Sequence, residues 1–168
     1  MLRVASATII LIAILSGLLV PLQAAIVGKP DAAPLPQPAV DLQPGDVVRI
    51  VIEALGRNDR PWPNAGIETT FNFASPANKV NTGPLERFIR MVKGPPYGIM
   101  VDHASSEFSE VVLMGDRAYQ MVRLSAADGR IVVFAFRLSR QQDGEFKNMW
   151  MTDAVWPVAT EAVPEQGF

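Results

Sequence analysis

Residues 118–140, AYQMVRLSAADGRIVVFAFRLSR, decide the fold of this chain. Side chains alternate with a period of two through 118–125 and 130–140, which is typical of β-strands. Asp128-Gly129, between the two runs, is among the strongest signals for a tight hairpin turn. The second run carries apolar residues on both of its faces, with Val132, Phe134, Phe136 and Leu138 on one and Ile131, Val133 and Ala135 on the other.

Shorter runs with the same period flank this hairpin. They predict further strands at 98–104, 107–114 and 147–156, joined through Gly115-Asp116 and Asp143-Gly144. Consecutive strands with short connections predict an antiparallel meander.

The half of the chain before residue 97 has helical spacing instead. Apolar residues recur at that spacing through 44–55, a short second helix is predicted at 66–73, and a third begins at Pro84 and ends before Gly94. Helices followed by strands indicate an α+β fold, with the N-terminal helices packed on a curved antiparallel β-meander.

The ends of the chain have a different composition. Arg3 precedes an uncharged, mostly apolar stretch at 4–22, so residues 1–25 are predicted to be a cleaved signal peptide, with a retained membrane anchor helix as the alternative. Residues 26–43 read as a Pro-rich linker, 44–157 as the folded domain and 158–168 as a flexible tail. The domain is therefore expected to be exported, and to lie in the periplasm or anchored at the outer face of the cytoplasmic membrane.

Composition excludes several kinds of chemistry. The chain has no Cys and one His, which rules out disulfides and thiolate nucleophiles and leaves few ways to build a metal site. It has 15 Lys and Arg against 17 Asp and Glu, with no basic stripe, so nucleic acid is not an expected partner. We expect no cofactor and no metal, and contact with a membrane only through the N-terminal segment.

Three stretches in the helical half carry a family resemblance: NAGI at 64–67, FNFASPAN at 71–78 and TGPL at 82–85, followed by Phe88 and Met91-Val92. They resemble the uncharacterised family called domain of unknown function 4864, over about residues 44–157. That family is similar to the cystatin-like, nuclear-transport-factor-like cone, in which a curved antiparallel sheet wraps a long helix. The resemblance implies a fold and supplies no catalytic residue.

Two residues are weak candidates for acid–base chemistry. His103 is the one histidine, and histidine is the side chain best suited to proton transfer near neutral pH. Adjacent Asp102 would point to the opposite face of a strand, so His103 would need a carboxylate from elsewhere, such as Asp153 or Glu68. Strand periodicity places Asp153 on an apolar face with Met149, Met151 and Val155, and places Trp150 and Trp156 together.

The stretch around FASP has two interpretations. It reads first as a structural corner, in which large apolar anchors precede a forced extended exit at Ser75-Pro76. In the alternative, Asn72, Asn78 and Thr82 line the mouth of the cone and contact a ligand.

The leading hypothesis is an exported, non-enzymatic accessory or small-ligand-binding module, and the ligand would be a small apolar molecule. The alternative is a cone-fold isomerase or dehydratase that uses His103 or Asp153 as acid or base. Because the 130–140 strand is apolar on both faces, we also expect a homodimer through the sheet face that the helices leave open.

Overall fold

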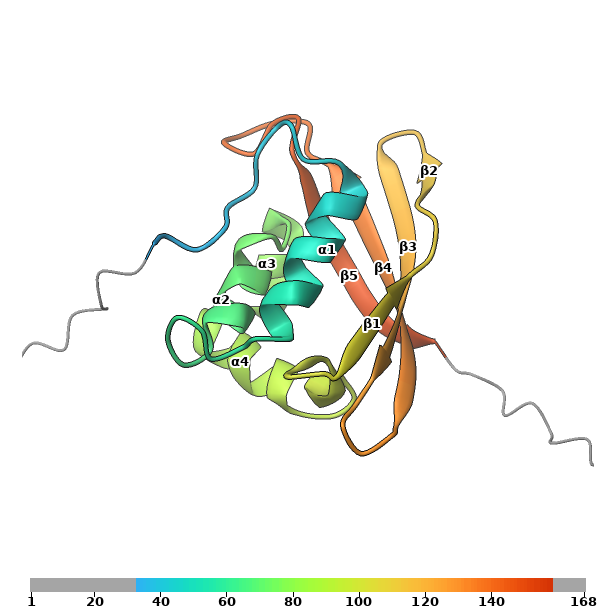
Figure 1. Ribbon diagram of the computed structural model, residues 1–168. Coiled ribbons are helices and arrows are strands. Elements are labelled where there is room, and N and C mark those ends of the chain that lie inside the picture. The colour runs from blue at the N-terminus through green and yellow to red at the C-terminus, as the bar shows by residue number, and fades with distance from the viewer. Residues whose placement is uncertain (1–32, 159–168) are drawn as a thin grey trace, which may run out of the picture. The chain divides into compact units, whose positions relative to one another are not determined.

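The computed structural model describes residues 33–158 (Figure 1). The predicted signal or anchor helix, the first part of the linker and almost all of the tail lie outside these residues. The elements are, in chain order, helices α1 (Pro44–Leu55), α2 (Ala65–Asn72), α3 (Pro76–Thr82) and α4 (Leu85–Lys93), the 3-10 helix η1 (Tyr97–Met100), and strands β1 (Ser105–Phe108), β2 (Val112–Met114), β3 (Arg117–Ser125), β4 (Ile131–Arg140) and β5 (Trp150–Val158).

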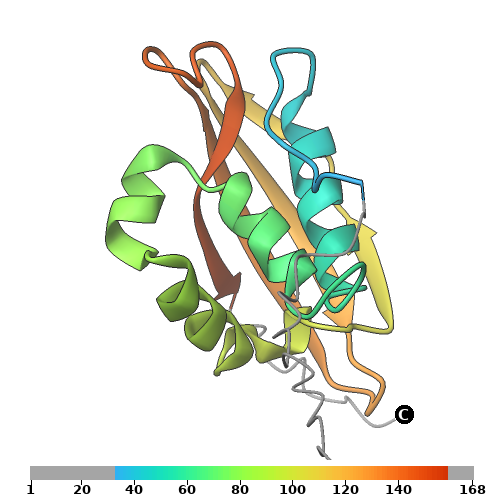
Figure 2. The ribbon, with the colours of Figure 1, turned by 90° about the vertical axis from the view of Figure 1, so that its left-hand side faces the viewer.

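The helices cover one face of the sheet (Figures 1 and 2). The strands form one antiparallel sheet in the order β1-β3-β4-β5, with β2 paired to β3. The predicted α+β class, with helices packed on an antiparallel meander, is confirmed. The core lies between the two layers, where α1 and the inner sides of β3 and β4 contribute Val47, Val48, Val51, Ile52, Leu55, Val122, Leu124, Phe134, Phe136 and Leu138.

The helix predicted at 44–55 is confirmed as α1, and residues at its start stabilise its N-terminus. Pro44 occupies the first turn, where a missing N–H costs nothing. The Asp46 carboxylate accepts a 2.9 Å hydrogen bond from the Gln43 N–H, which closes the helix N-terminus.

A helix that the sequence analysis missed follows α2. Ser75-Pro76, predicted as an extended exit, in fact begins α3. The Ser75 hydroxyl accepts the Asn78 N–H at 3.3 Å as an N-cap, and Pro76 occupies the first helical turn.

Two of the predicted strands were wrong. Residues 98–104 form η1 and a loop instead, because Asp102 has φ +51° and donates its N–H to the Leu55 carbonyl at the end of α1. In place of one strand at 107–114, the chain forms two short strands, β1 at 105–108 and β2 at 112–114, which pair with different parts of β3. The predicted hairpin of β3 and β4 is confirmed, with register from Arg117 opposite Ser139 to Ser125 opposite Ile131.

A bulge in β5 corrects the prediction of which residues share a face. Arg137 lies opposite Ala154 and Leu138 opposite Thr152, so Asp153 is an extra residue in β5. Trp150 consequently lies opposite Arg140 while Trp156 lies opposite Ala135, and the two tryptophans are on different faces. The prediction that Asp153 shares one face with Met149, Met151 and Val155 is wrong for the same reason, since Met151 lies opposite Ser139 and Val155 opposite core residue Phe136.

Candidate functional site

A cavity of about 370 Å³ lies where the helices meet the bulged strand. Its volume falls within the range of about 300–1,000 Å³ typical of small-molecule sites. Its wall is mostly apolar, with Val51, Leu55, Ala74, Phe88, Met91, Val92, Tyr97, Met100, Phe136, Ala154 and Val155. The polar lining residues are Thr70, Asn78, Asn81, Thr82, Arg137, Thr152 and Asp153.

The FASP corner places α3 beside this cavity. The Thr152 N–H donates to the Phe73 carbonyl at 2.8 Å and the Ser75 N–H donates to the Thr152 carbonyl at 2.9 Å, so the corner pairs with the edge of β5. The side chain of Asn78 donates a further 3.0 Å hydrogen bond to the Thr152 carbonyl. Helix α3 is therefore attached to β5 by both backbone and side-chain hydrogen bonds.

Two of the three residues predicted for the cone mouth line the cavity. Asn78 and Thr82 do so, and the Thr82 hydroxyl donates to the Asn78 carbonyl at 2.9 Å. Asn72 does not line it, because its side chain donates to the Pro36 carbonyl at 3.4 Å. The backbone carbonyl of Asn72 accepts a hydrogen bond from Lys79 Nζ at 3.2 Å.

Lys79 gives α3 further contacts with residues outside the helix. Its ammonium lies 5.6 Å from the ring centroid of Phe71 and 5.1 Å from that of Phe146, within cation–π range. Burial lowers the pKa of Lys79, and nearby Glu145 opposes that shift. These contacts fix the helix that carries Asn78 and Thr82.

Asp153 is the acidic residue in the cavity wall. Bulged residues often have their side chains re-aimed, and here half-buried Asp153 lies in the wall of a mostly apolar cavity. Its Oδ1 accepts a 2.9 Å hydrogen bond from the Ser139 hydroxyl. That bond orients one carboxylate oxygen.

His103 does not line this cavity. It follows η1, and its Nδ1 donates to the Met100 carbonyl at 2.9 Å. The imidazole packs on Gly56, where an added Cβ would lie 2.9 Å from His103 Cε1. The structure therefore does not bring His103 and Asp153 together at one cavity.

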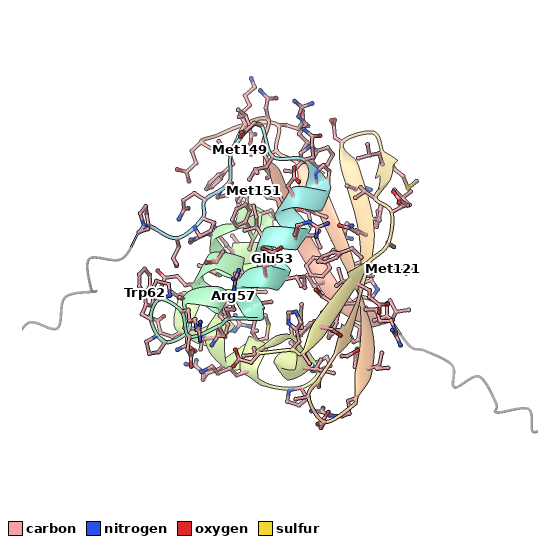
Figure 3. All side chains as sticks on the ribbon, viewed as in Figure 1. Glu53, Arg57, Trp62, Met121, Met149 and Met151 are labelled. Carbon is pink, nitrogen blue, oxygen red and sulfur yellow. The ribbon has the colours of Figure 1, made fainter. Side chains whose placement is uncertain are left out.

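Glu68, the other carboxylate considered for His103, is bonded elsewhere. It accepts a 2.9 Å hydrogen bond from the Trp62 indole, which docks the loop between α1 and α2. Figure 3 places Trp62 in that loop, away from the sheet.

The sequence did not indicate the lining residues Thr70, Asn81, Arg137 and Thr152, and Thr152 is the most deeply buried of them. It is 95% buried, and its Oγ1 has no hydrogen-bond partner among the described residues. Because the strand period breaks at Asp153, no sequence pattern indicates that Thr152 faces the helices. Only the register of β5 reveals it.

The described range also contains no group of three His, Cys, Asp or Glu side chains placed to hold a metal ion. Within 33–158, none of the helices is long and apolar enough to cross a membrane.

Comparison with known proteins identifies the family but no function. No curated protein and no solved structure matches the chain, so the likeness to a cystatin-like cone stays a prediction. The family described as "Domain of unknown function (DUF4864)" matches residues 43–161, which is more than half of the chain, and the chain belongs to that family.

Proposed function

We propose that this domain is a non-enzymatic accessory module that binds a small, mostly apolar molecule in the cavity beside α3, α4 and β5. The observation that supports this most strongly is the cavity itself, whose volume of about 370 Å³ and mostly apolar wall suit a small molecule. Polar residues in the wall can hydrogen-bond one end of such a molecule, while its apolar body gains from leaving water.

Native mass spectrometry of the full-length protein, purified under mild conditions, tests the proposal. We expect an additional small-molecule mass, and we expect Met91→Trp to remove it because Met91 lines the cavity and is 36% exposed at its edge. Met121→Trp is the matched control, since Met121 is 51% exposed on the outer side of the sheet (Figure 3). Bound mass that survives Met91→Trp and disappears with Met121→Trp would contradict the proposed site.

A catalytic alternative rests on Asp153. A carboxylate in an apolar chamber is a suitable acid or base for an isomerase or dehydratase. Since His103 lies outside the cavity, Asp153 would act without it. Turnover of a cavity ligand that is lost in Asp153→Asn, with binding retained, would favour this alternative.

Export is part of the same proposal. It is supported by Arg3 and the uncharged stretch at 4–22, followed by a linker with four prolines at 30, 34, 36 and 38. Protease added to spheroplasts should digest the domain, or the domain should leave the cells with the periplasmic fraction. Protection in both assays would contradict export.

We also propose that two copies pair through the outer sheet face. Apolar side chains there are exposed, including Met121 at 51%, Ile131 at 47% and Trp156 at 39%. The edge of this face carries both signs of charge, with Arg123 Nη1 at 3.2 Å from Glu107 Oε2, so two facing copies can offer opposite charges to one another. A standard dimer would bury roughly 800 Å² per partner.

Sedimentation equilibrium tests the dimer. The full chain should have twice the monomer mass, and Met121→Glu should halve it because a charge would be buried at the interface. Val80→Glu is the control, since Val80 is 83% exposed on α3, and it should remain dimeric. Wild-type protein that is monomeric at tens of micromolar would contradict the proposed dimer.

A further inference from the structure

We infer that the ligand of this cavity carries a hydrogen-bond donor, a hydroxyl or an amine, on an apolar body. The inference rests on the proposed function, since it concerns the chemistry of the same site. It follows from which hydrogen-bond donors and acceptors of the wall remain after the bonds within the protein are formed.

Three hydroxyl groups in the lining have already donated their single proton. Thr70 donates to the Gly66 carbonyl at 2.9 Å, Thr82 to the Asn78 carbonyl at 2.9 Å, and Tyr97 to the Val155 carbonyl at 3.0 Å. A carbonyl oxygen only accepts, so the direction of each bond is fixed. Each of these hydroxyls can offer only lone pairs to a ligand.

The other polar groups of the wall also offer acceptors. Asn78 and Asn81 each use one N–H on a backbone carbonyl, Thr152 O at 3.0 Å and Ala77 O at 2.9 Å respectively. Asn81 retains its oxygen and one N–H, whereas Asn78 retains one N–H, because its Oδ1 lies 3.3 Å from the Thr82 hydroxyl. Asp153 is an acceptor when ionised, and one of its oxygens remains beyond the bond from Ser139.

Donors are fewer. Arg137 and Asn81 line the cavity but are exposed, so water competes for their polar groups. The Thr152 hydroxyl is buried out of reach of a ligand. Among the half-buried polar groups of the wall, one N–H of Asn78 is the donor that remains, against the lone pairs of three hydroxyls and of the Asp153 carboxylate. A ligand that brings donors therefore leaves fewer groups unsatisfied.

Four probes with one apolar body test the inference by calorimetric titration of the full-length protein: 4-phenylbutan-1-ol, 4-phenylbutan-1-amine, 4-phenylbutanoate and 4-phenylbutyl methyl ether. The alcohol and the amine should bind about tenfold more tightly than the ether and the carboxylate, the scale of one added hydrogen bond. Asp153→Asn should weaken the amine about tenfold more than the alcohol, because only the amine forms a charge-assisted bond. This arm distinguishes ammonium ligands from alcohols.

The remaining outcomes separate the two proposals. If all four probes bind equally, or the carboxylate binds most tightly and Arg137→Gln removes that preference, the inference is wrong although the cavity still binds ligands. If none of the probes binds, and Met91→Trp does not change the bound mass seen by native mass spectrometry, the proposed function itself fails. Binding of the alcohol and amine that is lost in Met91→Trp supports both.

Discussion

Replacing Gly66 with Ala should lower the free energy of unfolding by about 3 kcal/mol, at the upper end of the cost of overpacking. Gly66 lies where the start of α2 crosses the end of α1. An added Cβ would overlap the Ala54 carbonyl oxygen and lie 2.9 Å from Asn58 Cα. These are backbone atoms that cannot rotate away, so the two helices must separate. Thermal denaturation followed by circular dichroism should show a midpoint lower by about 10 °C.

Gly94→Ala is the matched control for this substitution. Gly94 follows α4, and an added Cβ would lie 3.4 Å from its nearest neighbour, the Arg90 carbonyl oxygen, which is an ordinary contact. Its midpoint should therefore change by no more than about 2 °C, as for a surface substitution. Equal midpoints for Gly66→Ala and wild type would contradict the close helix crossing.

Deletion of Asp153 should remove the bulge and leave the register of β5 on β4 unchanged. Asp153 is the unpaired extra residue, so without it Ala154 stays opposite Arg137 and Val155 stays opposite Phe136. Val155 therefore keeps its place in the cavity wall. We expect a loss of about 1 kcal/mol in the free energy of unfolding, from the hydrogen bond that Ser139 donates to Asp153. Urea denaturation measures this loss.

Asp153→Ala separates the bulge from the carboxylate. It keeps the length of β5 and removes the hydrogen bond from Ser139, so its cost should be about 1 kcal/mol. The ability to bind 4-phenylbutan-1-ol should survive. A deletion that costs much more than the substitution would show that β5 needs the extra residue to keep its register.

Local signals made much of the fold predictable. The β3–β4 hairpin has alternating residues and an Asp-Gly turn, and α1 has a proline, a capping Asp and regular apolar spacing, so each element is specified by its own residues. Residues 98–104 have the period of a strand, but a backbone hydrogen bond from Asp102 to the end of α1 overrides it. That contact joins distant residues and has no local signal.

The site was less predictable because one extra residue shapes it. Asn78 and Thr82 were found from their place in the FASP stretch, and they line the cavity. Thr152 and the orientation of Asp153 depend on the bulge, and nothing in the composition of β5 marks where the extra residue lies. Strict alternation therefore assigned Val155 and Trp156 to the wrong faces.

Methyl NMR of the methionines tests the central claim, ligand binding in the cavity, most directly. Met91 and Met100 line the cavity, whereas Met114 is 64% and Met121 51% exposed on strands β2 and β3. Addition of 4-phenylbutan-1-ol to full-length protein labelled at the methionine methyl groups should shift the signals of Met91 and Met100, because an aromatic ring would lie against them. The signals of Met114 and Met121 should not move. Shifts confined to Met114 and Met121, or no shift at saturating probe, would contradict ligand binding in this cavity.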